Sequence, residues 1–287
     1  MSLPEYFTIP AFLITCSALV GLCIGSFLNV VIHRLPKMLE RQWLTDAADM
    51  RGEPEPDIPK IGLATPRSRC PHCGHQITAL ENIPLVSYLF LRGRCAHCKA
   101  PIGIRYPIVE IITAALSAAI AWKFGFGWQT AGALLLVWSL VALAFIDLDT
   151  FLLPDNITLP LVWLGLLFNL NNVFVSLNDA VVGAMAGYLS LWSVYWLFKL
   201  VTGKEGMGYG DFKLLAAIGA FLGWQALPAV IMLSSVVGAC VGISLMIFAR
   251  HGRETPIPFG PYLAAAGILS IFFGDSLSSL FIPLQAA

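Results

Sequence analysis

Long apolar runs separated by short polar stretches make up most of the chain. Eight of these runs approach the ~20 residues that a helix needs to cross the hydrocarbon core of a bilayer. We therefore predict eight transmembrane helices, the sixth of them short, at residues 10–32, 106–124, 128–147, 157–174, 179–201, 212–226, 228–249 and 259–282. The expected fold is an all-α polytopic membrane protein.

Composition supports this interpretation. The chain of 287 residues is 57% hydrophobic and only 12% charged, whereas soluble domains average roughly 45–50% apolar and about 25% charged residues. Its mean hydropathy is +0.78. These values exclude an ordinary soluble globular domain and predict a lipid bilayer as the main surrounding of the chain.

Residues 33–105 form the one extended polar segment and include a Pro- and acid-rich linker at 51–60. This segment holds eleven of the 17 Lys and Arg residues, and cytoplasmic loops are enriched in such residues. If this segment is cytoplasmic and all eight spans cross the membrane, Lys123 is the only one of the 17 Lys and Arg residues on the outer face. We predict a first transmembrane helix in 1–32, a cytoplasmic loop in 33–105 and a transmembrane core of about seven helices in 106–287.

The cytoplasmic loop carries four cysteines in two Cys-x2-Cys turns, at Cys70, Cys73, Cys95 and Cys98. Such paired turns are typical of a tetrahedral zinc site, and four protein ligands leave no open position for catalysis. We therefore predict a small module around a structural zinc ion. Disulfides are the alternative, but cytoplasmic thiols stay reduced. Three nearby histidines, each expected to be solvent-exposed, could replace a thiolate: His72, His75 and His97.

Acidic residues at the ends of predicted spans are the candidate catalytic groups, because ionisable side chains in a membrane are costly and often functional. Asp147 closes the third span, and Asp211 opens the sixth behind Gly206, Gly208 and Gly210. The topology places both at the cytoplasmic ends of their helices. Two close carboxylates share a proton, so one can activate water while the other polarises the scissile carbonyl. The glycines are expected to let the backbone turn tightly beside Asp211.

Other acidic residues compete for these roles. An aspartate at a span end is often only an interfacial residue or a helix cap. Asp149 lies two residues from Asp147, and local sequence does not separate the two. Asp155 is expected to cap the fourth span. Glu110, one turn into the second span, could pair with Arg105 or line the site.

Several motifs in this order resemble the type IV prepilin peptidases. They are Gly25-Ser-Phe-Leu-Asn29 to His33-Arg34-Leu-Pro36, the two cysteine turns, Arg105-Tyr-Pro107-Ile-Val-Glu110, Asp147-Leu-Asp149 to Leu153-Pro154-Asp155, and Gly206-Met-Gly208-Tyr-Gly210-Asp211-Phe-Lys213. The similarity covers nearly the whole chain.

The resemblance implies a bifunctional enzyme of the bacterial inner membrane. Such an enzyme cuts the leader from type IV prepilins and from pseudopilins of type II secretion at the cytoplasmic face, then methylates the new N-terminal residue with S-adenosylmethionine. It implies Asp147 and Asp211 as the catalytic pair and links Gly93 to methylation, although a turn before the second cysteine pair explains Gly93 equally well. Nucleic acid is not an expected partner, and a homo-oligomer is left open.

Two other classes of function remain in view. A transporter could relay protons through intramembrane acids, but it predicts internal repeats or broken helices, and the sequence has no repeat at a fixed period. A non-enzymatic assembly factor with a zinc module would tolerate the loss of either aspartate.

Overall fold

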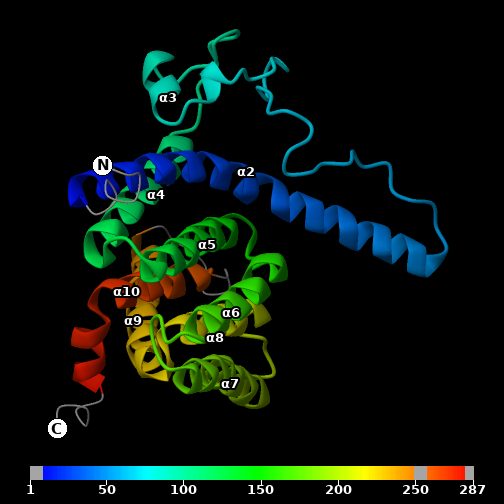
Figure 1. The fold of residues 1–287 in the computed structure, drawn as a ribbon. Helices are drawn as coiled ribbons and strands as arrows, with labels where there is room; N and C mark the ends of the chain where they lie inside the picture. The colour runs from blue at the N-terminus through cyan, green and yellow to red at the C-terminus, as the bar shows by residue number, and fades with distance from the viewer. Residues whose placement is uncertain (1–8, 249–256, 282–287) are drawn as a thin grey trace. The chain divides into compact units, whose positions relative to one another are not determined.

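The structure is a computed structural model that describes residues 9–248 and 257–281. Every regular element in these ranges is a helix, and the only strand-like pairings there are two isolated bridges, Arg69 with Gln76 and Arg94 with Pro101. The all-α expectation is therefore confirmed. The chain divides into two compact units, Met1–Trp122 and Lys123–Ala287, and Figure 1 shows the helices of each.

The first unit contains a long helix α2 (Pro10–Arg51), a short 3-10 turn η1 (Leu80–Asn82), the single-turn helix α3 (Val86–Phe90) and most of α4 (Arg105–Phe124). Helix α2 has 42 residues and does not end near residue 32, where the first span was predicted to end. Apolar residues recur at helical spacing beyond that point, at Leu35, Leu39 and Trp43, and Gly52 ends the helix with a φ of 68°. The first part of the predicted loop is thus helical.

Helices α2 and α4 approach closely through small residues. A Cβ atom at Gly21 would lie 2.6 Å from Ser117 Oγ, and one at Gly25 would lie 2.7 Å from the Cα of Glu110. Thr113 turns its hydroxyl to a carbonyl of its own helix. Small residues at such crossings let two membrane helices pack backbone to backbone. Glycine at 21 and 25 therefore sets the distance between α2 and α4.

The linker after α2 runs back along that helix. Arg41 Nε donates to the Ile58 carbonyl at 3.1 Å, and Arg34 Nη1 donates to the Gly62 carbonyl at 2.9 Å. Two arginines of α2 therefore fix a segment that has few apolar residues of its own to bury.

The second unit is a bundle of six helices and one 3-10 turn within its described residues: α5 (Trp128–Thr150), α6 (Asp155–Asn169), α7 (Leu177–Thr202), α8 (Tyr209–Leu222), η2 (Trp224–Ala226), α9 (Leu227–Phe248) and α10 (Gly260–Phe281). Helix α8 is the centre of this unit. It contacts α6, α7 and α10, and nearly every residue from Asp211 to Phe221 is buried (Figure 1).

Close packing around α8 again depends on glycine and on one buried amide. Gly183 of α7 and Gly219 of α8 meet backbone to backbone, with no room for a Cβ on either. Asn169, fully buried at the end of α6, donates to the carbonyls of Ala220 and Phe221 at 2.9 and 3.0 Å. These carbonyls belong to the last turn of α8, where helices leave acceptors unpaired. The amide of Asn169 thus joins α6 to the end of α8.

Five helices in the described ranges are long and apolar enough to cross a membrane: α2, α4, α5, α7 and the segment Trp224–Phe248 that includes α9. This confirms a multi-pass membrane protein. Helices α6 and α8 have 15 and 14 residues, or about 21–23 Å of rise against a hydrocarbon core of about 30 Å. In α10 the apolar part runs from Gly260 to Gly274, and Phe273 departs from helical angles. Arg250, Arg253 and the predicted span ends at 249 and 282 lie outside the described residues.

Candidate active site and metal centre

Asp147 and Asp211 come together in the second unit although they are far apart in sequence. Asp147 lies in the last turn of α5 and Asp211 in the first turn of α8, and their exposed fractions are only 5% and 6%. Leu153 packs against Gly210, which precedes Asp211, and against Gly260, whose N–H binds Asp147. The structure therefore brings together the two aspartates that the sequence singled out.

The two carboxyl groups have different surroundings. Asp147 Oδ2 accepts a hydrogen bond of 2.9 Å from the backbone N–H of Gly260, the first residue of α10. Asp211 Oδ1 is buried and has no hydrogen-bond partner in the part of the chain that the structure describes. A buried polar atom without a partner is costly, so Asp211 Oδ1 is suited to bind a water molecule or a substrate group.

Leu153 connects the chain segments that carry this site. A Cβ atom at Gly210 would lie 2.6 Å from Leu153 Cβ, and one at Gly260 would lie 3.1 Å from Leu153 Cδ2 and 2.7 Å from Asp147 Oδ2. Gly210 precedes Asp211 and Gly260 binds Asp147, so Leu153 packs against both sides of the pair. Leu153 and Gly260 are not among the site residues predicted from the sequence. The available signal was the Pro-Phe-Gly-Pro stretch at 258–261, which places a glycine at the start of an apolar helix.

The glycines before Asp211 leave room for neighbouring side chains. None of Gly206, Gly208 and Gly210 is among the described residues with positive φ, so these glycines do not supply a left-handed backbone conformation here. A Cβ atom at Gly206 would lie 2.9 Å from the Phe198 ring, and the one at Gly210 would meet Leu153. At these two positions a side chain has no room.

The other candidate acids differ from Asp147 and Asp211 in their burial or in their hydrogen-bond partners. Asp149 is exposed, in contrast to Asp147. The N-cap of α6 is Pro154 and Asp155 lies in the first turn of the helix, so the expected cap is wrong; Lys213 Nζ binds both oxygens of Asp155, at 2.6 and 2.7 Å. Glu110 belongs to the first unit, where its Oε2 accepts a 2.7 Å hydrogen bond from the Leu85 N–H.

The four cysteines form a compact cluster in the first unit. Their Sγ atoms all lie within 4.8 Å of one another, with 3.8 Å between Cys70 and Cys98 and 4.0 Å between Cys73 and Cys95. A tetrahedral zinc with Zn–S bonds of ~2.3 Å requires sulfur atoms roughly 3.8 Å apart. All four are free thiols. The donor set therefore fits a zinc ion, and the distances do not fit disulfides.

Both cysteine turns are closed by the same type of backbone hydrogen bond. Cys70 N donates to the His75 carbonyl and Cys95 N to the Ala100 carbonyl, each at 2.8 Å. Backbone N–H groups of Cys73 and His72 lower the pKa of the Cys70 thiol to about 7, which favours the thiolate that binds metal. In the described residues the metal-binding group consists of cysteines alone. His75 instead pairs with Glu81 at 3.2 Å.

Gly93 has a structural explanation next to this cluster. Its φ is +65°, and a Cβ atom there would lie 2.9 Å from the Tyr88 ring. Its N–H donates to the Tyr88 carbonyl at 2.9 Å, and its own carbonyl accepts from Ile102 N at 2.7 Å. Glycine at 93 therefore joins α3 to the second cysteine turn.

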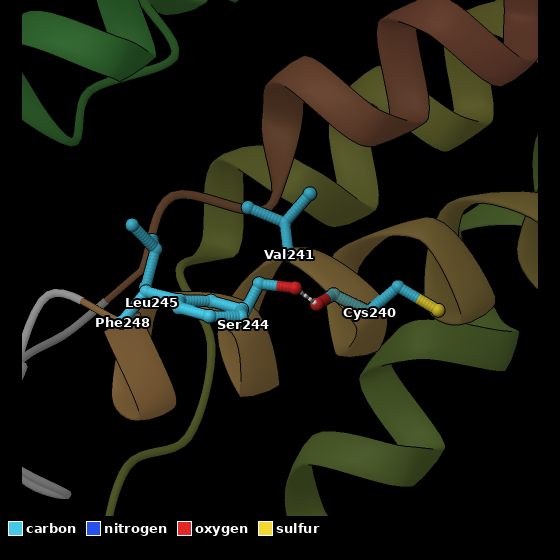
Figure 2. A pocket seen from close by; sticks show the side chains of 5 residues that line it. All are labelled: Cys240, Val241, Ser244, Leu245 and Phe248. Atoms are coloured by element: carbon cyan, nitrogen blue, oxygen red, sulfur yellow. Dashed lines mark hydrogen bonds between the residues drawn. The ribbon is translucent and has the colours of Figure 1, made fainter.

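A surface hollow of about 410 Å³ lies elsewhere, along α9. Figure 2 shows its lining residues, Cys240, Val241, Ser244, Leu245 and Phe248, with the Ser244 hydroxyl donating to the Cys240 carbonyl. All five belong to one apolar helix, and none comes from α5 or α8. No carboxyl, imidazole or amino side chain lines this hollow, and the Ser244 hydroxyl is bonded within its own helix.

Comparison with known proteins identifies the family. Residues 19–124 match the bacterial peptidase A24 N-terminal domain, and residues 134–243 match the type IV leader peptidase family. A protein of Aeromonas hydrophila named prepilin leader peptidase/N-methyltransferase is 63% identical over 269 residues, 92% of each chain. The chain belongs to the type IV leader peptidase family.

Other relatives agree with this assignment. Proteins with the same name from Pseudomonas aeruginosa and Burkholderia pseudomallei are 57% and 52% identical; the first alignment covers 95% of this chain and 94% of the relative, the second 88% and 83%. No solved structure gives a significant match. The match to the peptidase family spans both Asp147 and Asp211, and the N-terminal match spans all four clustered cysteines.

Proposed function

We propose that this chain removes the leader peptide from type IV prepilins and pseudopilins and then methylates the new N-terminal residue. The family and the name shared by its relatives support this function. The observation that carries the peptidase half is the meeting of two buried carboxyl groups from α5 and α8. Membership of this family favours an enzyme over the transporter and the assembly factor.

In the proposed mechanism the two aspartates divide the work. Asp147, held by the Gly260 N–H at 2.9 Å, acts as the carboxylate that takes a proton from the attacking water. Asp211, whose Oδ1 has no partner among the described residues, donates a hydrogen bond to the scissile carbonyl. This division is the usual one for a pair of close carboxyl groups.

We propose that the membrane core in 106–287 carries cleavage and that the loop in 33–105 carries the zinc module at the cytoplasmic face of the inner membrane. All eight apolar helices would cross the membrane, with the short α6 and α8 surrounded by longer ones. Cys70, Cys73, Cys95 and Cys98 would hold zinc in a closed, structural site, since four thiolates fill a tetrahedral ion.

For methylation the donor implied by the relatives' name is S-adenosylmethionine, which supplies the methyl group when bound. We assign Gly93 to this half of the function through its place between α3 and the second cysteine turn. A side chain at this position would push on Tyr88 and disturb the module.

The test uses purified protein in detergent, a prepilin that bears its leader, and S-adenosylmethionine with a labelled methyl group. The proposal predicts a product shortened by the leader and carrying label on its new N-terminus. An intact prepilin, under conditions in which the 63% identical relative cuts its own substrate, would contradict the proposal.

A further inference from the structure

The cysteine module carries an exposed apolar surface that the catalytic site does not use. Residues 83–91, here called the apolar lobe, read Ile-Pro-Leu-Val-Ser-Tyr-Leu-Phe-Leu and contain no charged residue. Leu89 and Phe90 of α3 are 65% and 84% exposed, and Val86 is 43% exposed. Positions i, i+3 and i+4 share one face of a helix, so these three side chains form one continuous apolar surface.

A hydrogen bond joins the lobe to a membrane-spanning helix. The Leu85 N–H donates to Glu110 Oε2 at 2.7 Å. Helix α4 begins at Arg105 and has 20 residues, a length of about 30 Å that is needed in full to cross the hydrocarbon core. Glu110 lies five residues inside this helix, about 7–8 Å along its axis. The lobe therefore lies close to the end of the membrane-spanning helix at which α4 begins, and Figure 1 shows α3 near that end.

Helix α2 confirms the level of this end of the span. Asn29 Nδ2 donates to the Tyr106 carbonyl at 3.0 Å, so the apolar part of α2 runs beside the same turn of α4. The neighbouring residues Ile104 and Tyr106 are themselves 69% and 47% exposed. The apolar surface of the lobe is thus continuous with the apolar surface that α4 presents to lipid.

We propose that the apolar lobe is inserted into the interfacial layer of the bilayer, where phospholipid covers Val86, Leu89 and Phe90. Short amphipathic segments bind there through apolar side chains on one face and cations near the headgroups. The cations are present, because exposed Arg92 and Arg94 follow the lobe directly. A prepilin segment would also cover an apolar surface, but it does not account for a surface level with the first turns of a span.

The consequence is a second attachment of the cysteine module to the membrane. The hydrogen bond between Leu85 and Glu110 holds the module to α4, and the lobe holds it to lipid. The module then stays at the membrane surface, beside the level at which a membrane-anchored substrate would present its leader.

The experiment places a photoreactive side chain in the full-length protein. Phe90→p-benzoylphenylalanine tests the exposed tip of the lobe, and Leu89→p-benzoylphenylalanine tests a second position on the same face. His72→p-benzoylphenylalanine is the matched control. His72 is also exposed on the module, but it lies in the first cysteine turn and outside the apolar lobe. Each variant is placed in liposomes of phosphatidylethanolamine and phosphatidylglycerol with a labelled acyl chain, and its zinc content shows that the module is folded.

After illumination, the variants at positions 90 and 89 should form labelled lipid adducts. The variant at position 72 should form none. Equal labelling at all three positions would overturn the proposal. So would a cross-link from position 90 to the peptidase core or to added prepilin that replaces the lipid adduct, since either would identify protein as the occupant. None of these outcomes depends on cleavage or methylation.

Discussion

Gly260 offers the sharpest single test of the catalytic geometry. Its N–H is the hydrogen-bond donor to Asp147 Oδ2, at 2.9 Å. In Gly260→Ala the new Cβ would lie 2.7 Å from that oxygen and 3.1 Å from Leu153 Cδ2. Such contacts are shorter than van der Waals distances, so the carboxyl group or the start of α10 must move. The φ of Gly260 is outside the positive range, and the cost of alanine is therefore steric.

The expected loss can be estimated from the hydrogen bond. A bond to a charged group contributes about 1.5–3 kcal/mol, and each 1.4 kcal/mol is a tenfold change. Gly260→Ala should therefore reduce kcat/KM for leader cleavage by about ten- to 150-fold. Methylation of a pre-cleaved substrate should stay near the wild-type rate, because the cysteine module belongs to the other unit.

The assay follows cleavage of a prepilin in detergent beside a matched control in the same helix. Gly274→Ala is suitable, since nothing lies within 4 Å of a Cβ built at Gly274. Cleavage by this control should be unchanged. Cleavage at the wild-type rate by the Gly260→Ala variant would refute the role of Gly260. An equal loss of cleavage and methylation would indicate general unfolding instead.

Three further outcomes are expected. Cys95→Ser should remove a zinc ligand, so that zinc content measured by atomic emission falls from about one per chain toward zero; full retention of metal would contradict the closed four-cysteine site. Gly93→Ala, strained at φ +65° and against Tyr88, should abolish methyl transfer while leader cleavage continues, and loss of cleavage alone would refute it. Glu110→Ala should lower stability by about 1–3 kcal/mol because the Leu85 N–H loses its acceptor; thermal unfolding measures this, Glu110→Gln should lose less, and no change in Tm would contradict the assignment.

The helical architecture could be predicted from the sequence because lipid leaves few alternatives. Backbone polar groups must be paired internally in the membrane, and apolar runs of sufficient length become helices. The course of α2 beyond residue 32 was missed because its polar residues and Pro36 suggested a loop. There the apolar residues recur at helical spacing, which was the available signal.

The chemistry of the site was predictable by residue type but not by contact. Asp147 and Asp211 stood out because acids at span ends are costly, whereas the choice of Asp147 over Asp149 needed the family resemblance. The structure adds burial as a physical reason, since Asp149 is exposed. The bond from Gly260 to Asp147 joins residues 113 positions apart. No local pattern predicts such a contact, because it arises only when α10 packs against α5.

The proposed mechanism requires both Asp147 and Asp211 for cleavage of the substrate. The most direct measurement compares leader cleavage by wild type, Asp147→Asn, Asp211→Asn and the exposed control Asp149→Asn, with methylation of a pre-cleaved substrate followed in the same samples. Cleavage should be lost in Asp147→Asn and Asp211→Asn and kept in Asp149→Asn, while all four proteins should methylate the pre-cleaved substrate. Cleavage that survives in Asp147→Asn or Asp211→Asn would contradict the proposed mechanism.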